Sequence, residues 1–337
     1  MKSSKMLANL SLRLSSSSSM VVPFPIQTLF NQHLTSNLKT LLSSSTSRPS
    51  SNDCVMTVSF LAHALDALVA TQKLAHESLP SFGEPSDREA MERYLEENSI
   101  DLLDACNGLG DKLDNVCEYV KSLRLALHCL EGRSRMFPPT SMAVARAKKL
   151  LQSCQAMGIE STKSSTSSLI PSLKKIVEHQ RMNSRETKNK YDLRSELEEI
   201  LDGSSVVTST IFEILDSTLL KHGNGHNTTV VKMSGSATSY QSWLSLLQEL
   251  RNNYLKKETK KSLQVRELQN TVWLAQELRQ ELRSQDCSKL RVRVEELKRS
   301  CDELENGVKF LEGKVKEVYR YLMCVRMGLL GKLSSMA

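Results

Sequence analysis

The sequence predicts an all-α fold, an elongated helical bundle that ends in a long helix with a coiled-coil-like heptad pattern. Apolar residues recur at spacings of three and four over most of the chain, which places them on one face of a helix. Stretches rich in serine, glycine or proline separate these segments. The one stretch with the composition of a strand, residues 206–211, is too isolated to build a sheet.

These breaks set the predicted domain boundaries. We assign residues 53–158 to an N-terminal helical region, 172–221 to a charged helical region and 240–332 to a C-terminal helical hairpin. A Ser/Thr-rich linker, 159–171, and a flexible Gly/Asn-rich linker, 222–239, separate these regions, and residues 333–337 form a tail.

The first 52 residues have a composition of their own. They are rich in serine, carry five basic side chains and contain no acidic one. Such a segment has too little apolar surface to order itself, so we predict that it is disordered. The same composition is typical of an organelle transit peptide. The apolar run at residues 21–30 also offers a membrane contact, and all three interpretations stay open at this point.

Three helices are expected between residues 53 and 158. The first runs to about residue 79, with Asn52 or Asp53 as its N-cap. After a proline-containing loop, Ser86 and Glu89 have the spacing of a capping box and start a long helix that reaches about residue 130. The third helix starts at the Thr-Ser pair at 140 and 141 and ends near residue 157.

Two further helices, 173–201 and 206–220, are expected in the middle of the chain. In the C-terminal hairpin, an apolar stripe that includes Trp243, Leu250 and Leu278 is expected to fold back on the last helix. The turn of this hairpin is placed near residues 284–288, and the two arms are antiparallel.

The last helix carries the sharpest pattern in the sequence. From Leu290 to Leu329, apolar residues follow one another at spacings that alternate between four and three without a break. Leucine dominates one heptad position and valine the other, as in a coiled coil. Two alternatives stay open, a stripe buried inside the bundle and a dimeric coiled coil. As a partner-binding stripe we select Leu297, Leu304, Val308, Leu311, Val315, Val318 and Leu322.

The formal net charge is +7, and the excess of basic residues lies in the first 52 residues and after residue 250. This asymmetry favours an anionic partner, such as an acidic phospholipid surface or an acidic protein. The basic, amphipathic last turns, 314–332, fit either a membrane contact or the closing helix of the bundle. Nucleic acid is not expected, because glutamates interleave with the lysines and arginines and aromatic residues are scarce.

No motif of the sequence points to catalysis, to a cofactor or to a metal ion. Cys106, Cys117 and His128 share a helix face, but each step of eleven residues is a rise of about 16 Å, too long for one metal ion. We therefore predict a protein that is not an enzyme, with no catalytic, cofactor-binding or metal-binding residues. Eight scattered cysteines and the lack of a predicted membrane-spanning helix favour the cytoplasm.

Three stretches resemble the plant BYPASS-related family, whose members are helical. These are YLEENSIDLLDACN at residues 94–107, LRLALHCL at 123–130 and ELENGV at 303–308. The resemblance is clear over residues 53–135 and 290–332 and is loose between them.

The resemblance implies a developmental regulator that restrains a root-derived mobile signal affecting shoot growth, without known catalytic residues. On this basis we expect a regulatory adaptor that binds protein partners through helical surfaces. The family is also associated with membranes and, in one branch, with exocyst subunits. The alternative is therefore a peripheral membrane protein that assists vesicle tethering or exocytosis. A homodimer, an anionic membrane partner and a chloroplast location stay open.

Overall fold

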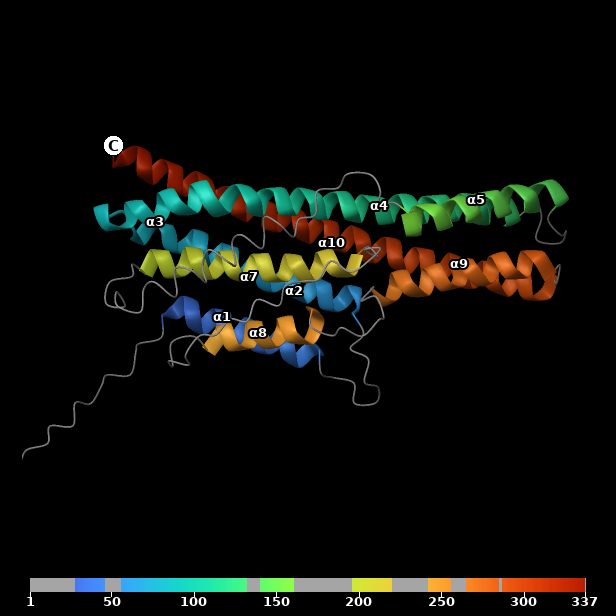
Figure 1. The fold of residues 1–337 in the computed structure, drawn as a ribbon, viewed down its shortest axis with the longest axis horizontal. Coiled ribbons are helices and arrows are strands. Elements are labelled where there is room, and N and C mark those ends of the chain that lie inside the picture. Colours follow the sequence, from blue (N-terminus) through green and yellow to red (C-terminus); the bar gives the residue numbers. More distant parts are fainter. Residues whose placement is uncertain are drawn as a thin grey trace, which may run out of the picture.

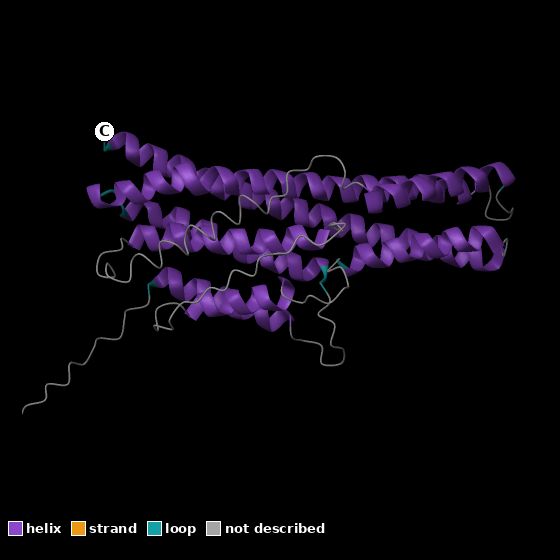
Figure 2. Cartoon of the chain, in the orientation of Figure 1, coloured by secondary structure: helices purple, strands orange, loops and turns teal. Residues whose placement is uncertain are grey.

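The computed structural model describes residues 28–45, 56–131, 140–160, 196–219, 242–255, 265–284 and 287–336. Every regular element within these ranges is helical, so the predicted all-α class is confirmed (Figure 2). In chain order the elements are α1 (Leu29–Ser45), α2 (Val58–Ser78), the short turns η1 (Leu79–Ser81) and η2 (Pro85–Asp87), α3 (Arg88–Arg93), the π-helical turn η3 (Tyr94–Asn98), α4 (Ser99–Glu131), α5 (Ser141–Glu160), α7 (Glu196–Leu219), α8 (Ser242–Leu255), α9 (Arg266–Ser284) and α10 (Cys287–Ser335).

The helices form an elongated bundle whose long axis follows α4 and α10 (Figure 1). Helices α2, α4 and α9 each pack against α10, and α5 lies along α4. Helix α7 packs between α2 and α4, and α8 contacts both α7 and α1. Because α8 packs on α1 and α7, the antiparallel hairpin of the C-terminal region consists of α9 and α10 alone.

The heptad stripe of α10 is buried within the chain. Cys301, Leu304, Val308, Leu311, Val315, Val318 and Leu322 are each at most 5% exposed, and Leu297 is fully buried. The stripe packs mainly against α2 and α4, which supply the apolar partners that a second chain would supply in a dimer. The seven selected side chains are therefore not an accessible partner-binding surface in this fold, and a partner has to contact other residues.

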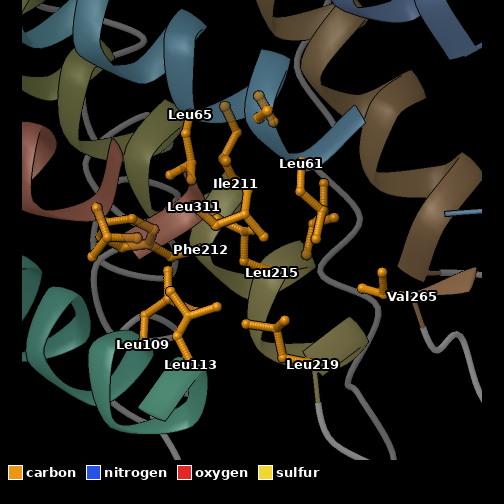
Figure 3. Packing of buried hydrophobic residues seen from close by; sticks show 14 of the residues in the cluster. Leu61, Leu65, Leu109, Leu113, Ile211, Phe212, Leu215, Leu219, Val265 and Leu311 are labelled. Carbon is orange, nitrogen blue, oxygen red and sulfur yellow. The ribbon is translucent and has the colours of Figure 1, made fainter. Parts of the chain in front are cut away.

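Helix α7 lies in the centre of the core. Every residue from Gly203 to Asp216 is buried, as is typical of a helix that is packed on all sides. Figure 3 shows α7 side chains meeting those of α2, α4 and α10; the labelled residues are Leu61, Leu65, Leu109, Leu113, Ile211, Phe212, Leu215, Leu219, Val265 and Leu311.

The prediction of two separate helices around residue 203 is wrong, because α7 is continuous from Glu196 to Leu219. The Gly-Ser-Ser sequence at 203–205 suggests a break, but the hydroxyls of Ser204 and Ser205 donate hydrogen bonds to the carbonyl of Leu201 within the helix. Gly203 is needed for close packing, since a Cβ there would lie 2.9 Å from the ring of Phe30. Residues 173–195 of the expected charged helix lie outside the described residues.

The prediction that residues 1–52 are disordered is wrong for residues 29–45, which form α1. One face of α1 is buried against the body, with Phe30, Leu34, Leu38, Leu41 and Leu42 at most 8% exposed. Asn31 also donates a 2.6 Å hydrogen bond from Nδ2 to Glu199 Oε1 of α7. The buried residues recur every three or four positions, but serines and threonines between them hide the stripe in a composition count.

Two predicted N-caps lie at other residues. Thr57 caps α2, and its Oγ1 accepts a 3.2 Å hydrogen bond from the backbone N–H of Phe60. Before α3, the carboxylate of Asp87 accepts hydrogen bonds from the backbone of Gly83 and Glu84, so the local cap starts before Pro85 and not at Ser86. The third cap is confirmed, since Thr140 Oγ1 accepts from the N–H of Ala143 at 3.3 Å.

Polar side chains join α7 to its neighbours inside the core. Lys112 of α4 forms an ion pair with Asp216, and both side chains are at most 7% exposed. Arg251 of α8 lies 3.0 Å from a carboxylate oxygen of Glu213. Gln72 of α2 donates a 2.8 Å hydrogen bond to Thr208 Oγ1. Such pairs demand one register between the helices, because a shifted helix leaves a buried charge without its partner.

Replacing Lys112 by methionine is therefore expected to lower the free energy of unfolding by about 3–5 kcal/mol, because Asp216 becomes a buried charge without its partner. The double variant Lys112→Met/Asp216→Leu is expected to recover most of this loss. Urea unfolding of both variants measures the effect. Lys121→Met is the control, since it breaks an exposed pair with Glu118 and is expected to change stability by less than about 1 kcal/mol. A double variant as unstable as the single one contradicts the account.

Candidate functional site

A surface groove of about 630 Å³ lies where α2, α9 and α10 meet. Its lining combines apolar, acidic and small side chains: Val58, Ser59, Ala62, His63 and Asp66 of α2, Glu267 of α9, and Glu303, Asn306, Gly307 and Phe310 of α10. We call this the α2/α10 groove. Of its α10 residues, Glu303, Asn306 and Phe310 are exposed and lie outside the buried stripe.

Helices α2 and α9 are joined at one end of the groove. The backbone N–H of Arg266 donates to the carbonyl of Met56 at 2.8 Å. Glu267 Oε2 accepts a 3.1 Å hydrogen bond from the backbone N–H of Val58, in the first turn of α2. A carboxylate is favoured there because the first N–H groups of a helix have no partners within the helix. Both bonds fix the position of the groove's acidic end.

Helix α10 contributes the floor and an aromatic wall. Gly307 lets α2 approach closely, since a Cβ at this position would lie 2.9 Å from Cγ1 of Val58. Three residues further on, Phe310 is 52% exposed. Lys314 lies one turn beyond, with its Nζ 5.8 Å from the centre of the Phe310 ring and 2.8 Å from Asp66 Oδ1. An exposed phenylalanine at a fixed position is an anchor of the kind that protein partners bury.

The charges of the groove are predominantly acidic. Asp66, Glu267 and Glu303 contribute carboxylates, and Lys314 is held at the edge by Asp66 and Glu317. The hydrogen bond to Asp66 raises the pKa of the Lys314 ammonium. Glu303 is exposed and forms no ion pair with another described residue. The groove therefore offers acidic and apolar contacts side by side.

The described cysteines of the core are protonated thiols. Burial raises the pKa of Cys106 and of Cys301 to about 12, and that of Cys154 to about 11. A thiol with such a pKa is a poor nucleophile and a poor metal ligand at neutral pH. Within the part of the chain that the structure describes, no three His, Cys, Asp or Glu residues lie close enough together to hold a metal ion.

The basic last turns of α10 close the bundle. Arg326 donates a 3.1 Å hydrogen bond to the carbonyl of Leu95 and another to Ser99 Oγ. Leu95 lies in the π-helical turn η3, and its carbonyl also accepts a 3.0 Å hydrogen bond from Ser99 Oγ. Lys332 donates to the carbonyl of Phe82. These two cations hold α10 against the turns before α4. Their contacts favour the alternative in which the last turns of α10 are the closing helix of the bundle.

Sequence reasoning missed the residues of the α2/α10 groove. Phe310 and Glu303 stand at outward positions of the heptad pattern, where side chains are usually solvated, and Gly307 weakens the pattern. The phenylalanine at an outward position was the one feature of the sequence that indicated a binding site here.

Two observations bear on the membrane. No described helix combines the length and the apolar character needed to cross a bilayer. Among the described residues, the large exposed apolar side chains lie on α1, α4, α5, α9 and α10, and α10 carries five of them: Val292, Phe310, Tyr319, Met327 and Leu330.

Comparison with known proteins places the chain in a family. No curated protein and no solved structure matches it. The sequence model of one family, described as "Protein ROH1-like", matches residues 4–197, which is more than half of the chain. The match includes α1 to α5 and the first residues of α7, and therefore the α2 wall of the groove. The chain belongs to the ROH1-like family.

Proposed function

We propose that this ROH1-like protein is a non-enzymatic regulatory adaptor that binds a protein partner through the α2/α10 groove. Membership of the family supports a regulatory role. The resemblance to BYPASS-related proteins supports a place in plant development, with restraint of a mobile signal from the root as the process to examine. The single observation that carries the binding proposal is the half-exposed Phe310 beside three carboxylates in a groove built by three helices.

The chemistry of the groove defines the kind of partner. Glu303 favours a lysine or arginine side chain, since Asp66 already pairs with Lys314 and Glu267 already accepts from Val58. Phe310 with Val58 and Ala62 favours an apolar neighbour. A partner segment that presents a basic residue next to a leucine or an aromatic residue satisfies both. The volume of the groove is enough for a few side chains, so the partner contributes a short segment and not a whole surface.

Selection from a displayed library of random peptides tests this proposal with the purified full chain. We expect the selected peptides to share a lysine or arginine next to an apolar residue. For such a peptide, the variant Glu303→Lys/Phe310→Ala is expected to lose at least about 30-fold in affinity, which corresponds to one interface hot spot.

The matched control is Glu295→Lys/Tyr319→Ala, which changes the same charge and also removes one exposed ring, on the same helix but outside the groove. Its affinity is expected to stay close to that of the natural chain. Selection of acidic peptides, or an equal loss in both double variants, would reject the groove as the binding site. A selection that enriches no motif would do the same.

A further inference from the structure

One end of the bundle gathers basic side chains from helices that are far apart in the sequence. Helix α4 ends there, α5 begins there, and α9 turns into α10 (right in Figure 1). We call this the hairpin end. Its helices contact one another, since α5 packs on both α4 and α9, and α9 packs on α10.

Many cations of the hairpin end have no acidic partner among the described residues. They come from three helices: Arg146, Lys148 and Lys149 of α5, Arg283 of α9, and Arg291 and Arg299 of α10. All of them except the half-buried Lys148 are exposed. Glu131 pairs with Lys298, and Glu277 and Glu296 pair with Arg293, whereas the exposed Glu295 lies one helical turn from both Arg291 and Arg299 on α10. The hairpin end therefore has an unbalanced positive charge.

Apolar side chains are exposed among these cations. Met142 at the start of α5 is 65% exposed, and Val292 beside Arg291 is 57% exposed. An isolated exposed apolar residue needs no explanation, but two of them at a basic end match the composition of surfaces that lie on lipid headgroups. The nearby Trp273 is covered on one face by Arg293, whose guanidinium carbon lies 5.6 Å from the ring centre, so it is a poor stacking platform for a nucleobase.

We propose that the hairpin end binds an anionic membrane surface. The charge complementarity carries this inference, and the exposed Met142 and Val292 favour lipid over nucleic acid. The hairpin end differs from the two membrane contacts that the sequence suggests, the N-terminal segment and the last turns of α10. In the last turns of α10, Arg326 and Lys332 bind carbonyls within the bundle, whereas Arg146, Lys149 and Arg291 have no acidic partner among the described residues. A long bundle held at one end leaves the α2/α10 groove free for its own partner.

Vesicle flotation with the full chain tests the proposal. The vesicles contain phosphatidylcholine alone or with about a quarter of phosphatidylserine, enough for an attraction of about 1 kcal/mol per basic residue near the surface. The natural chain is expected to float only with the anionic vesicles and to detach as the salt concentration rises. The triple variant Arg146→Gln/Lys149→Gln/Arg291→Gln is expected to bind about 100-fold more weakly.

The matched control is Lys309→Gln/Lys316→Gln/Arg320→Gln, which removes the same number of positive charges from exposed positions of α10 away from the hairpin end. It carries the same N-terminal residues as the triple variant, so any contribution from that basic segment cancels. The control is expected to bind like the natural chain. Substituting serine for Val292 is expected to weaken binding while leaving its salt dependence unchanged.

Four results would overturn the proposal. They are equal binding by the triple variant and the control, binding to neutral vesicles as strong as to anionic ones, no binding to either, and stronger binding to a single-stranded RNA oligonucleotide than to the vesicles. The groove variant Glu303→Lys/Phe310→Ala is expected to float normally, so the two proposals fail or hold separately.

Discussion

A chain that begins at residue 46 is expected not to fold cooperatively, whereas a chain that begins at residue 28 is expected to unfold like the full-length protein. The shorter chain lacks α1 and therefore five side chains that are at most 8% exposed. Burial of a large apolar side chain contributes about 1.5–3 kcal/mol. The loss is thus comparable with the whole stability of a typical domain, about 5–15 kcal/mol.

Thermal and urea unfolding of the two shortened chains, followed by circular dichroism, measure this effect. Leu34→Ala in the full chain is expected to cost about 2–5 kcal/mol, because Leu34 is 2% exposed. Leu29→Ala in the same helix is the control and is expected to cost little, because Leu29 is 74% exposed. A cooperative transition in the chain that begins at residue 46 would contradict the packing of α1. A transit peptide that ended near residue 52 would remove α1, so any cleavage is expected before residue 29.

Val308→Asp and Val315→Asp are each expected to unfold the bundle. Both valines lie in the heptad stripe of α10 and are at most 5% exposed. A carboxylate placed in the apolar stripe is removed from water and costs several kcal/mol even after local relaxation. Each substitution is therefore expected to lower the free energy of unfolding by more than about 4 kcal/mol, at the upper end of single substitutions.

Lys309→Asp is the control, since Lys309 is the exposed neighbour of Val308 and, within the part of the chain that the structure describes, pairs only with Glu305. It is expected to change stability by about 1 kcal/mol or less. Circular dichroism and light scattering of the three variants separate the two alternatives for the stripe. If Val308→Asp kept a cooperative transition and only converted a dimer to a monomer, the stripe would be an interface between chains.

Much of the fold follows from periodicity. The extents of α2, α4, α5 and α10 were predictable because each repeats apolar residues on one face over several turns. Helix α1 was missed because its apolar residues are diluted by serine, and composition over 52 residues hides a stripe of five. The continuity of α7 was missed because a Gly-Ser-Ser sequence is compatible with either a helix or a break. Its place in the helix depends on the packing of the Phe30 ring against Gly203, which the sequence does not show. These errors share one cause, since long-range packing decides them and periodicity is local.

The candidate site was less accessible to sequence reasoning than the fold. The α2/α10 groove depends on three segments that meet only in the folded chain, and no motif connects Asp66 with Glu267 or Phe310. The stripe of α10 was the sharper pattern, and it forms core because α2 and α4 cover it. The residues of a regular apolar repeat are the ones that a helix buries in the core. The irregular outward residues, here Phe310 and Gly307, indicate what it leaves for a partner.

Recognition by the α2/α10 groove is the central claim, and a charge exchange tests it most directly. For a peptide selected by the chain, titration calorimetry compares the natural chain with Glu303→Arg, and the peptide with a version whose basic residue is glutamate. Each single reversal is expected to weaken binding tenfold or more, about 1.4 kcal/mol, and the two reversals together are expected to restore it. If the two losses added without restoration, or if Glu303→Arg bound the original peptide as well as the natural chain does, the groove would not be the binding site.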